Sequence, residues 1–586
     1  MDNSASYLRS SESGVYMREG YAGIPYSDGG ELESRMLGDV IACTDVSDSS
    51  PELRGRITDW PSEYHFSPLR ANLLRPFSFK GKRVLELGCG CGALTRFLGE
   101  SGADVVAVEG SPRRAAIAAA RCRDLPNVRV YCDNIAGFGV DNDFEVVTLI
   151  GVLEYARVFF PSTDDAVQRC LQIARGFLAD DGELYLAIEN QLGLKYFNGC
   201  SEDHTGIPYF GIHDCYTEQG VVTFGKKELA GRLQAAGFTN TEFFFPFPDY
   251  KLPELILSEQ ALAHPDLCLG DLLCHANSRD YGKPALQAFH EGLAWRGIAR
   301  NGLVGDLANS FLVRASKKVE KCPADWYAHT YAAGRLREYA TENVIFQKDG
   351  ALQVSKRNLF NGADAGPSPR IRHVIGTQSY VSGTLYIVDL QRMMANGDGM
   401  DAVTEWARPW LKFLRENANE RGQLPGEFID CIPTNLICGR DRQFHYIDAE
   451  WQATSEIPLV WVAVRGLIIS SLVSPMPTAF ESMTYRCFAA AILDDAGIAY
   501  TDRDWEVLAE WEDSLRMMCY GRFRDPVGFA DRLNLKVMPR PVFLTIHNVL
   551  NQAEAEIKRV KGTVSWKVTK PLRFIYNMFR KIVGVR

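Results

Sequence analysis

Three glycines at alternating positions form the part of this sequence best suited to chemistry. Gly88, Gly90 and Gly92 directly follow an apolar run, and Glu86 lies two residues before the first glycine. Glycine allows a sharp backbone turn and lets a ligand approach the bare main chain. A helix expected over 93–100 would direct its positive N-terminal end at that ligand. The pattern therefore predicts a site for a nucleotide-type cofactor.

Polar side chains follow the next strands of the sequence. A strand expected over 104–108 ends at Glu109, where a carboxylate can accept hydrogen bonds from ribose hydroxyls. The next strand, over 128–131, is followed by Asp133 and Asn134. Further strands are expected over 144–150, 182–188, 242–245 and 310–315. Strands that alternate with helices predict an α/β fold with a doubly wound parallel sheet, which binds ligands at the carboxyl ends of its strands.

Two cofactors fit the glycines. Gly88, Gly90 and Ala93 match the dinucleotide pattern G-x-G-x-x-G/A, so a NAD site stays open on the glycines alone. Glu86 inside the motif and the polar residues at 133–134 argue against NAD. Taken together, these residues resemble the class I S-adenosylmethionine-dependent methyltransferases.

That resemblance implies a seven-strand sheet and a role for each polar residue. Glu86 and the loop over 88–92 would face the methionine part of S-adenosylmethionine. Glu109 would bind the ribose and Asp133 the adenine, with Asn134 beside them in the cofactor site.

The methyl acceptor places its own demands on the site. A sugar hydroxyl needs a general base, whereas a phosphate needs cations instead. We expect His65 or His204 to act as the base, with Asp203 next to the latter. The residues expected to bind the acceptor are Tyr64, Arg70, Glu154, Lys195 and Tyr250. For each of these side chains, a structural role is the alternative.

A second set of residues has the spacing of a phosphoryl-transfer site. Asp430 and Asn435 form a D-x-x-x-x-N pattern, and Asp448 follows thirteen residues later at a strand end. Phosphoryl transfer needs a base, metal ligands and a lysine on the phosphates. The spacing resembles eukaryotic-type and aminoglycoside-type kinases. The resemblance implies that Asp430 is the base, that Asn435 and Asp448 bind Mg²⁺, and that Lys356 binds the phosphates of ATP.

The sequence departs from the kinase pattern in three places. Phe428 and Ile429 replace the histidine and arginine that precede the base. The glycine-rich loop is reduced to the neighbourhood of Gly334, and no glutamate lies between Lys356 and the hinge expected over 379–385 to pair with the lysine. A kinase-like domain that only binds or scaffolds is therefore the alternative.

Length and composition indicate several domains. The chain has 586 residues and a net charge of −9, which argues against a general nucleic-acid-binding protein. The 15 cysteines are scattered and are expected to be cytosolic thiols. We expect a loose N-terminal extension over 1–55, the methyltransferase domain over 56–318, an α+β kinase-like domain over 323–540 and a C-terminal helix over 541–586.

The C-terminal segment is basic and amphipathic. No acidic residue occurs over 557–586, and apolar residues over 572–583 recur at helical spacing with basic residues between them. Such a helix is typical of a membrane-surface anchor. A helix that packs on protein is the alternative.

The order of the three parts resembles the bifunctional methyltransferase–kinase enzymes that cap bacterial O-antigen polysaccharides. The residues over 565–573 also resemble C-terminal segments of polysaccharide-assembly glycosyltransferases. These resemblances imply a lipid-linked polysaccharide substrate, glycosyltransferase partners and a place on the cytoplasmic face of the inner membrane. Two other functions stay open: a sugar-hydroxyl methyltransferase with an inactive kinase-like domain, and an interaction protein that recruits a polysaccharide synthase.

Overall fold

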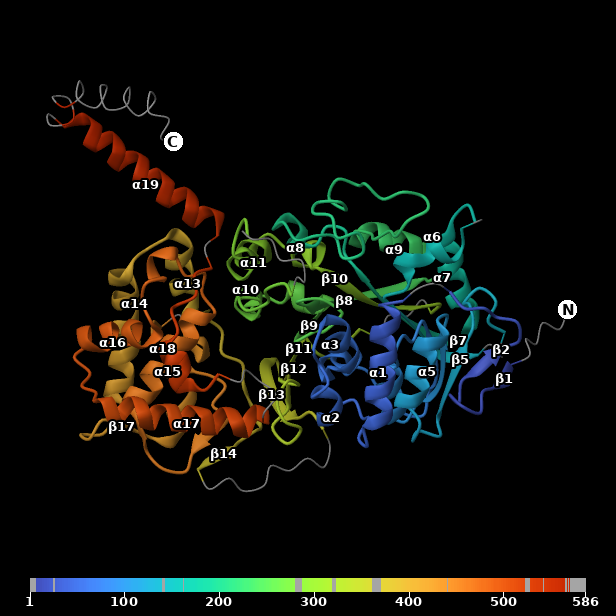
Figure 1. Ribbon diagram of the computed structural model, residues 1–586, viewed down its shortest axis with the longest axis horizontal. Helices are drawn as coiled ribbons and strands as arrows, with labels where there is room; N and C mark the ends of the chain where they lie inside the picture. The colour runs from blue at the N-terminus through green and yellow to red at the C-terminus, as the bar shows by residue number, and fades with distance from the viewer. Residues whose placement is uncertain are drawn as a thin grey trace, which may run out of the picture.

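The structure of the chain is a computed structural model (Figure 1). It describes residues 7–24, 27–139, 143–161, 163–279, 287–318, 323–360, 370–439, 441–521, 527–540, 542–563, 566 and 569. The basic amphipathic segment predicted over 572–583 lies outside the described residues.

A mixed sheet of 14 strands runs through the molecule, and its middle part is the predicted seven-strand sheet. Those seven strands lie in the spatial order β5-β4-β3-β6-β7-β10-β8. Their bounds are β3 Arg83–Leu87, β4 Asp104–Glu109, β5 Val128–Cys132, β6 Phe144–Ile150, β7 Leu178–Glu189, β8 Asn240–Phe247 and β10 Ser310–Ser316. Strands β3 to β7 pair in parallel, and β10 is antiparallel to both of its neighbours. The expected doubly wound parallel sheet is confirmed.

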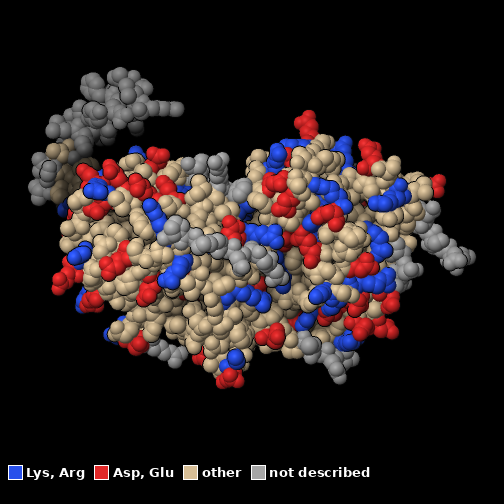
Figure 2. All heavy atoms as spheres, turned by 90° about the horizontal axis from the view of Figure 1, so that it is seen from below, with Lys and Arg blue, Asp and Glu red and all other residues tan. Residues whose placement is uncertain are grey.

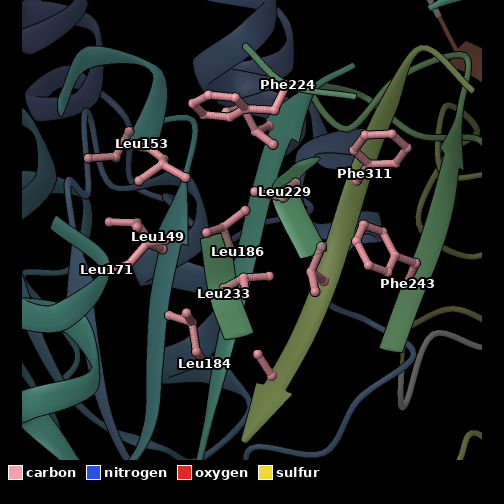
Figure 3. Packing of buried hydrophobic residues seen from close by; sticks show 14 of the residues in the cluster. Leu149, Leu153, Leu171, Leu184, Leu186, Phe224, Leu229, Leu233, Phe243 and Phe311 are labelled. Carbon is pink, nitrogen blue, oxygen red and sulfur yellow. The ribbon is translucent and has the colours of Figure 1, made fainter. Parts of the chain in front are cut away.

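Successive residues of the central strands face opposite sides of the sheet, and both sides are buried. Val147 and Leu149 belong to the core on one side, whereas Val146 belongs to the core on the other. Figure 3 shows Leu149, Leu184 and Leu186 of the strands near Leu171, Leu229 and Leu233 of the helices. Each fully buried leucine contributes about 1.5–3 kcal/mol. Burial on both sides explains why these strands read as continuous apolar runs.

Helices cover the two sides of this sheet. Their bounds are α3 Trp60–Phe66, α4 Ala93–Glu100, α5 Pro112–Arg121, α6 Ala156–Phe159, α7 Ala166–Phe177, α8 Leu194–Phe197, α9 Lys226–Ala235, α10 Leu269–Leu272, α11 Glu291–Arg300 and α12 Val304–Leu307. Short 3₁₀ turns are η1 Pro68–Leu73, η2 Leu153–Tyr155 and η3 Glu259–Ala263. Helix α4 is contiguous with the glycine loop, so its N-terminus faces the carboxyl ends of the strands.

The N-terminal residues are built into the fold, although we expected a loose extension. Strands β1 (Tyr7–Arg9) and β2 (Tyr16–Arg18) extend the sheet beyond β5, while α1 (Gly30–Ala42) packs on α5 and is followed by α2 (Pro51–Arg54). Met36 and Val40 are fully buried against Ile117 of α5. Their i, i+4 spacing marks one apolar face of a helix within an otherwise polar stretch. The polar composition of residues 1–55 as a whole gave no indication of this apolar face.

The sheet continues across the expected boundary near residue 320. Strand β9 (Leu255–Ser258) pairs with β8 and with β11 (Ala328–Tyr331), and β12 (Thr341–Lys348), β13 (Ala351–Asn358) and β15 (Thr377–Ser379) follow. Asp349 and Gly350, an Asp-Gly pair typical of hairpin turns, join β12 to β13, and they have positive φ angles of 51° and 80°. The two halves of the chain therefore contribute strands to one continuous β-sheet.

The second half adds a helical core (Figure 1). Its helices are α13 Ile387–Asn396, α14 Met400–Glu416, α15 Leu459–Leu472, α16 Tyr485–Asp495, α17 Asp502–Tyr520 and α18 Phe529–Asn534, with 3₁₀ turns η4 Gly426–Asp430, η5 Pro433–Asn435 and η6 Thr478–Phe480. Its short strands are β14 Ile371–His373, β16 Thr384–Leu385, β17 Gln423–Leu424, β18 Leu436–Cys438, β19 Phe444–Tyr446, β20 Trp451–Ala453 and β21 Ile457–Pro458. The strongly apolar residues over 459–472 form the buried helix α15, whose Trp461 is 1% exposed.

Helix α19 (Phe543–Gly562) starts against α13 and then extends away from the body (Figure 1). The hydroxyl of Thr545 donates a hydrogen bond of 2.8 Å to the carbonyl of Ala395 in α13. Among the described helices, none combines the length and the hydropathy that a membrane span requires. Acidic and basic side chains are interspersed on the face seen in Figure 2.

Candidate functional site

The glycine loop has the backbone that its residues predict. Gly88, Gly90 and Gly92 have φ angles of +82°, +56° and +79°. A Cβ at Gly88 would lie 2.4 Å from Cγ2 of Val152, and a Cβ at Gly92 would lie 2.7 Å from Cα of Ala118. At Gly90 the nearest atom would be 3.6 Å away. The loop thus needs glycine at two positions for packing, and at the third it leaves space toward a pocket.

This pocket lies at the carboxyl ends of β3, β4, β5 and β6. The predicted residues that line it are Tyr64, His65, Arg70, Glu86, Gly88, Gly90, Glu109, Asp133 and Asn134. Tyr155, which follows β6, also lines the pocket, as do Ile24, Arg114 and Phe159, for which the sequence predicted no contact. Gly92 packs on α5 instead. Residues scattered over 24–159 are therefore brought to one cavity.

Two glutamates brace the glycine loop. Glu86 is 4% exposed and accepts a 2.6 Å hydrogen bond from the hydroxyl of Thr95 in α4. Burial raises the pKa of Glu86 to about 7. Glu109 accepts hydrogen bonds of 2.8 Å from the amide of Gly90 and 2.9 Å from the amide of Ser111. Both carboxyl groups lie where a cofactor with hydroxyl and ammonium groups could be bound.

Asp133 is held by the N-terminal strands. Its carboxylate accepts hydrogen bonds of 2.6 Å from the hydroxyl of Tyr7 and 3.3 Å from the guanidinium of Arg18. The amide of Asn134 donates a third, of 2.7 Å. Tyr7 and Arg18 were not predicted, and no local pattern could have found them because they are more than 100 positions away from Asp133 in the sequence.

His65 lies in a buried polar group at the pocket wall. Its Nε2 is 3.3 Å from the carboxylate of Asp28, and the guanidinium of Arg114 lies 3.2 Å from the same carboxylate oxygen. Burial lowers the pKa of His65 to about 4. The imidazole is therefore neutral at neutral pH, but this low pKa also makes it a weak base.

Arg70 forms part of the pocket wall and is hydrogen-bonded to neighbouring residues. Its guanidinium donates hydrogen bonds of 2.9 Å and 3.2 Å to the carbonyls of Tyr250 and Lys251, and it lies 4.7 Å from the ring centroid of Tyr64. Tyr250 is 2% exposed and packs within the core rather than lining the pocket. These contacts hold the loop over 250–251 in place. Arg70 therefore has a structural role, which was the expected alternative to binding the acceptor.

A buried network of charged and polar groups adjoins the pocket behind Tyr155. The hydroxyl of Tyr155 is 3.0 Å from Nδ1 of His204, whose Nε2 is 3.4 Å from the carboxylate of Glu189. Burial alone would lower the pKa of His204, but the carboxylates of Glu189 and Glu154 raise it to about 9. His204 is thus protonated at neutral pH, which argues against its predicted role as a base.

Glu154 lies in the same network with a shifted pKa of its own. It is 1% exposed, and burial together with the charge of Glu189 raises its pKa to about 8. Glu154 therefore carries a proton at neutral pH. It lies behind the pocket wall rather than in it, so the predicted acceptor contact is not direct.

Asp203 joins two lysines within this network. Its carboxylate oxygens lie 2.6 Å from Nζ of Lys195 and 2.6 Å from Nζ of Lys251. Burial opposes ionisation of Asp203, but the two ammonium groups hold its pKa well below its usual range. Asp203 and Lys195 therefore neutralise each other in the interior. The arrangement does not support the predicted base at Asp203 or the predicted substrate contact of Lys195.

Three of the four residues of the second pattern line another pocket, and the fourth, Asp430, lies beside one of them. Lys356, Asn435 and Asp448 line it, between the sheet and β18–β19. Nζ of Lys356 forms an ion pair with Asp448, and the side-chain amide of Asn435 donates a 3.0 Å hydrogen bond to Asp430. Asp448 has a φ angle of 61°, a strained conformation that occurs often at functional sites.

Glu450 is an acidic partner of Lys356, in place of the glutamate that the sequence lacks between Lys356 and the hinge. Its carboxylate is 2.9 Å from Nζ of Lys356, 2.6 Å from the guanidinium of Arg335 and 3.2 Å from Nε2 of His373. Burial opposes ionisation, but His373 and Arg335 hold the pKa of Glu450 well below its usual range. Its position two residues after Asp448 was the one available signal in the sequence.

Comparison with known proteins agrees with the first site. Residues 62–242 match the family model described as a methyltransferase domain, and this range contains the glycine loop and the polar strand ends. Residues 62–242 form a class I S-adenosylmethionine-dependent methyltransferase domain. The resemblance seen in the glycine loop is confirmed at this level, and the cofactor of the methyltransferase domain is S-adenosylmethionine. A search of curated proteins found no significant match.

Solved structures similar to the methyltransferase domain share little sequence with it. A TehB-like S-adenosylmethionine-dependent methyltransferase from Corynebacterium glutamicum is 15% identical, with 43% of this chain and 88% of that chain covered and a TM-score of 0.23. A possible histamine N-methyltransferase from Thermotoga maritima is 16% identical, with 44% and 91% covered and a TM-score of 0.26. The N-methyltransferase NodS from Bradyrhizobium japonicum is 14% identical, with 42% and 92% covered and a TM-score of 0.24.

Proposed function

We propose that the methyltransferase domain methylates the terminal sugar of a bacterial surface polysaccharide such as O-antigen, on a hydroxyl or on a phosphate. The observation that carries the proposal is the pocket in which Glu86, Gly90, Glu109 and Asp133 meet at the carboxyl ends of β3 to β5. The glycan acceptor rests on the resemblance to O-antigen capping enzymes in the order of the parts.

The residues of the pocket fit S-adenosylmethionine. The space above Gly90, which a larger residue would begin to fill, lets a ligand lie against the main chain. Glu109 would accept hydrogen bonds from the ribose hydroxyls, and Asp133, which also accepts hydrogen bonds from Tyr7 and Arg18, would bind the adenine. When bound, the sulfonium supplies an activated methyl group, and the protein's task is to align the acceptor with it.

We propose a second activity, ATP-dependent phosphorylation of the same sugar terminus, for the second half of the chain. Lys356, Asn435 and Asp448 line one pocket, and Asp430 lies 3.0 Å from the amide of Asn435. Lys356 would hold the phosphates, and Asn435 and Asp448 would hold Mg²⁺. The pairing of Lys356 with Glu450 takes the place of the glutamate that is missing between Lys356 and the hinge, and it weakens one argument against activity.

The alternative, a methyltransferase of a sugar hydroxyl with an inactive kinase-like domain, is favoured by the loop around Gly334. The guanidinium of Arg54, from the methyltransferase half, donates hydrogen bonds to the carbonyls of Gly334 and Arg335. A nucleotide-binding loop needs its backbone free to close on phosphates, and this loop is anchored from outside. Asp430 is likewise paired, with the guanidinium of Arg465 at 3.0 Å.

We also propose that the basic residues beyond α19 attach the protein to the cytoplasmic face of the inner membrane, close to polysaccharide-assembly glycosyltransferases. Basic residues near an anionic leaflet contribute about 1 kcal/mol each. Such attachment would bring both pockets to a lipid-linked substrate.

The test is transfer of labelled methyl from S-adenosylmethionine to a lipid-linked glycan extract, with and without ATP and Mg²⁺. Methylation that depends on ATP supports phosphorylation before methylation. Equal methylation without ATP supports the alternative, and no methylation under either condition contradicts the glycan acceptor. Asp430→Ala serves as the control, because it should abolish the ATP-dependent methylation and leave the binding of S-adenosylmethionine unchanged.

A further inference from the structure

Tyr155 connects the methyltransferase pocket to the buried network behind it. The residue follows β6 directly and ends the 3₁₀ turn η2. Its side chain lines the pocket beside Phe159 and Val152. Its hydroxyl is also 3.0 Å from Nδ1 of His204, so one side chain contacts both regions.

The network behind Tyr155 fixes the orientation of His204 from several sides. Nε2 of His204 faces Glu189 at 3.4 Å, and the backbone amide of His204 donates a 2.9 Å hydrogen bond to Glu202. Glu154 and Lys251 also face this imidazole. Nζ of Lys251 lies 2.8 Å from the other oxygen of Glu189. The histidine is thus clamped between a carboxylate and the tyrosine hydroxyl.

The protonation of His204 decides the direction of its bond to Tyr155. A protonated imidazole carries hydrogen on both ring nitrogens, so both nitrogens donate. Nε2 then donates to Glu189, and Nδ1 donates to the oxygen of Tyr155. A hydroxyl that accepts this bond keeps its own proton for donation to another group.

We propose that Tyr155 donates a hydrogen bond to the acceptor oxygen in the methyltransferase pocket, and that His204 and Glu189 are positioning residues that hold the tyrosine hydroxyl in this orientation. The inference rests on the proposed methyl transfer. Tyr155 would be a catalytic residue because it touches the reacting oxygen, and it would align that oxygen with the methyl group. A hydrogen bond at this position is worth about tenfold to a hundredfold in rate.

The same three side chains could be read as a metal site. One oxygen or nitrogen each from Glu154, Glu189 and His204 lies within 4.8 Å of the others. However, the ammonium of Lys251 is already 2.8 Å from Glu189, and His204 and Glu154 carry protons. Protons and an ammonium group therefore balance the charge of this cluster, and we assign it the orienting role.

The experiment compares Tyr155→Phe, Glu189→Gln and wild type in the full chain. Tyr155→Phe should lower kcat about tenfold to a hundredfold and change the Kd of S-adenosylhomocysteine less than about twofold. Tyr209→Phe is the matched control, because Tyr209 also stacks with a histidine, His213, but is 42% exposed and lies outside the pocket. The control should keep full activity.

A second readout does not depend on activity. The pKa of His204, followed by NMR of labelled histidine, should lie near 9 in wild type and fall in Glu189→Gln. The activity of wild type should decline as the pH rises through the same value, and Tyr155→Phe should lose that decline.

Several results would overturn the inference. Wild-type rates in Tyr155→Phe would show that its hydroxyl does not bind the acceptor. A His204 pKa that is the same in Glu189→Gln and in wild type would refute the clamp. A His204 resonance that shifts when Mg²⁺ alone is titrated into the protein would assign the cluster to a metal. Absence of methyl transfer in wild type would instead contradict the proposed function, and the NMR result would then decide the clamp alone.

Discussion

Replacing Gly88 with alanine tests whether the glycine loop is shaped by packing as well as by its ligand. The φ angle of +82° at Gly88 costs an L-residue about 1–2 kcal/mol. The added Cβ would lie 2.4 Å from Cγ2 of Val152, and overpacking of this kind costs about 1–3 kcal/mol. We therefore expect the free energy of unfolding to fall by about 2–5 kcal/mol.

A matched control separates the two causes. Gly302 has a φ angle of +70°, but nothing lies within 4 Å of a Cβ built there. Gly302→Ala should thus lose only the 1–2 kcal/mol or so of backbone strain. Val152 lines the cofactor pocket, so Gly88→Ala should also weaken binding of S-adenosylmethionine by about tenfold or more.

The assays are urea denaturation for stability and isothermal titration calorimetry for the cofactor. Equal losses of stability in Gly88→Ala and Gly302→Ala would refute the clash with Val152. An unchanged cofactor Kd in Gly88→Ala would refute the placement of the ligand against this loop.

Two further predictions follow from the polar clusters. The folded-state pKa of His65 is lowered from 6.5 to about 4, so between these pH values the unfolded chain binds a proton that the folded chain does not. The free energy of unfolding should therefore fall by up to about 3 kcal/mol as the pH drops from 6.5 to 4. Denaturation of His65→Gln, measured across the same pH range, should lack this loss. Glu450→Gln should weaken ATP binding or turnover about tenfold, because Lys356 would lose an ion-pair partner. Glu427 is exposed, so the control Glu427→Gln should match wild type. Equal ATP titrations of the two variants would contradict the role of Glu450.

The sequence predicted features whose residues lie close together along the chain. The glycine loop, Glu86, Glu109 and Asp133 follow from strand–turn–helix patterns, because strand ends in a parallel sheet meet at one edge. The hairpin whose second strand contains Lys356 follows from its Asp-Gly turn, because these two residues adopt the positive φ angles that a tight turn needs.

Features built from distant residues could not be predicted. Tyr7 and Arg18 reach Asp133 only because β2 adds to β5, and nothing in the residues over 1–18 specifies that pairing. The sequence likewise gave no sign that β9 and β11 pair across residue 320. The roles of Asp203 and His204 depend on charges that come from several elements. Residue type alone therefore suggested a base where the structure has an ion pair and a histidine whose pKa is raised by neighbouring carboxylates.

The central claim, a pocket for S-adenosylmethionine at the glycine loop, is tested most directly by calorimetric titration of the full chain with S-adenosylhomocysteine and, separately, with NAD. The account predicts saturable binding of S-adenosylhomocysteine that Gly88→Ala weakens, and no heat with NAD. Binding of NAD in place of S-adenosylhomocysteine, or binding of S-adenosylhomocysteine that Gly88→Ala leaves unchanged, would contradict it.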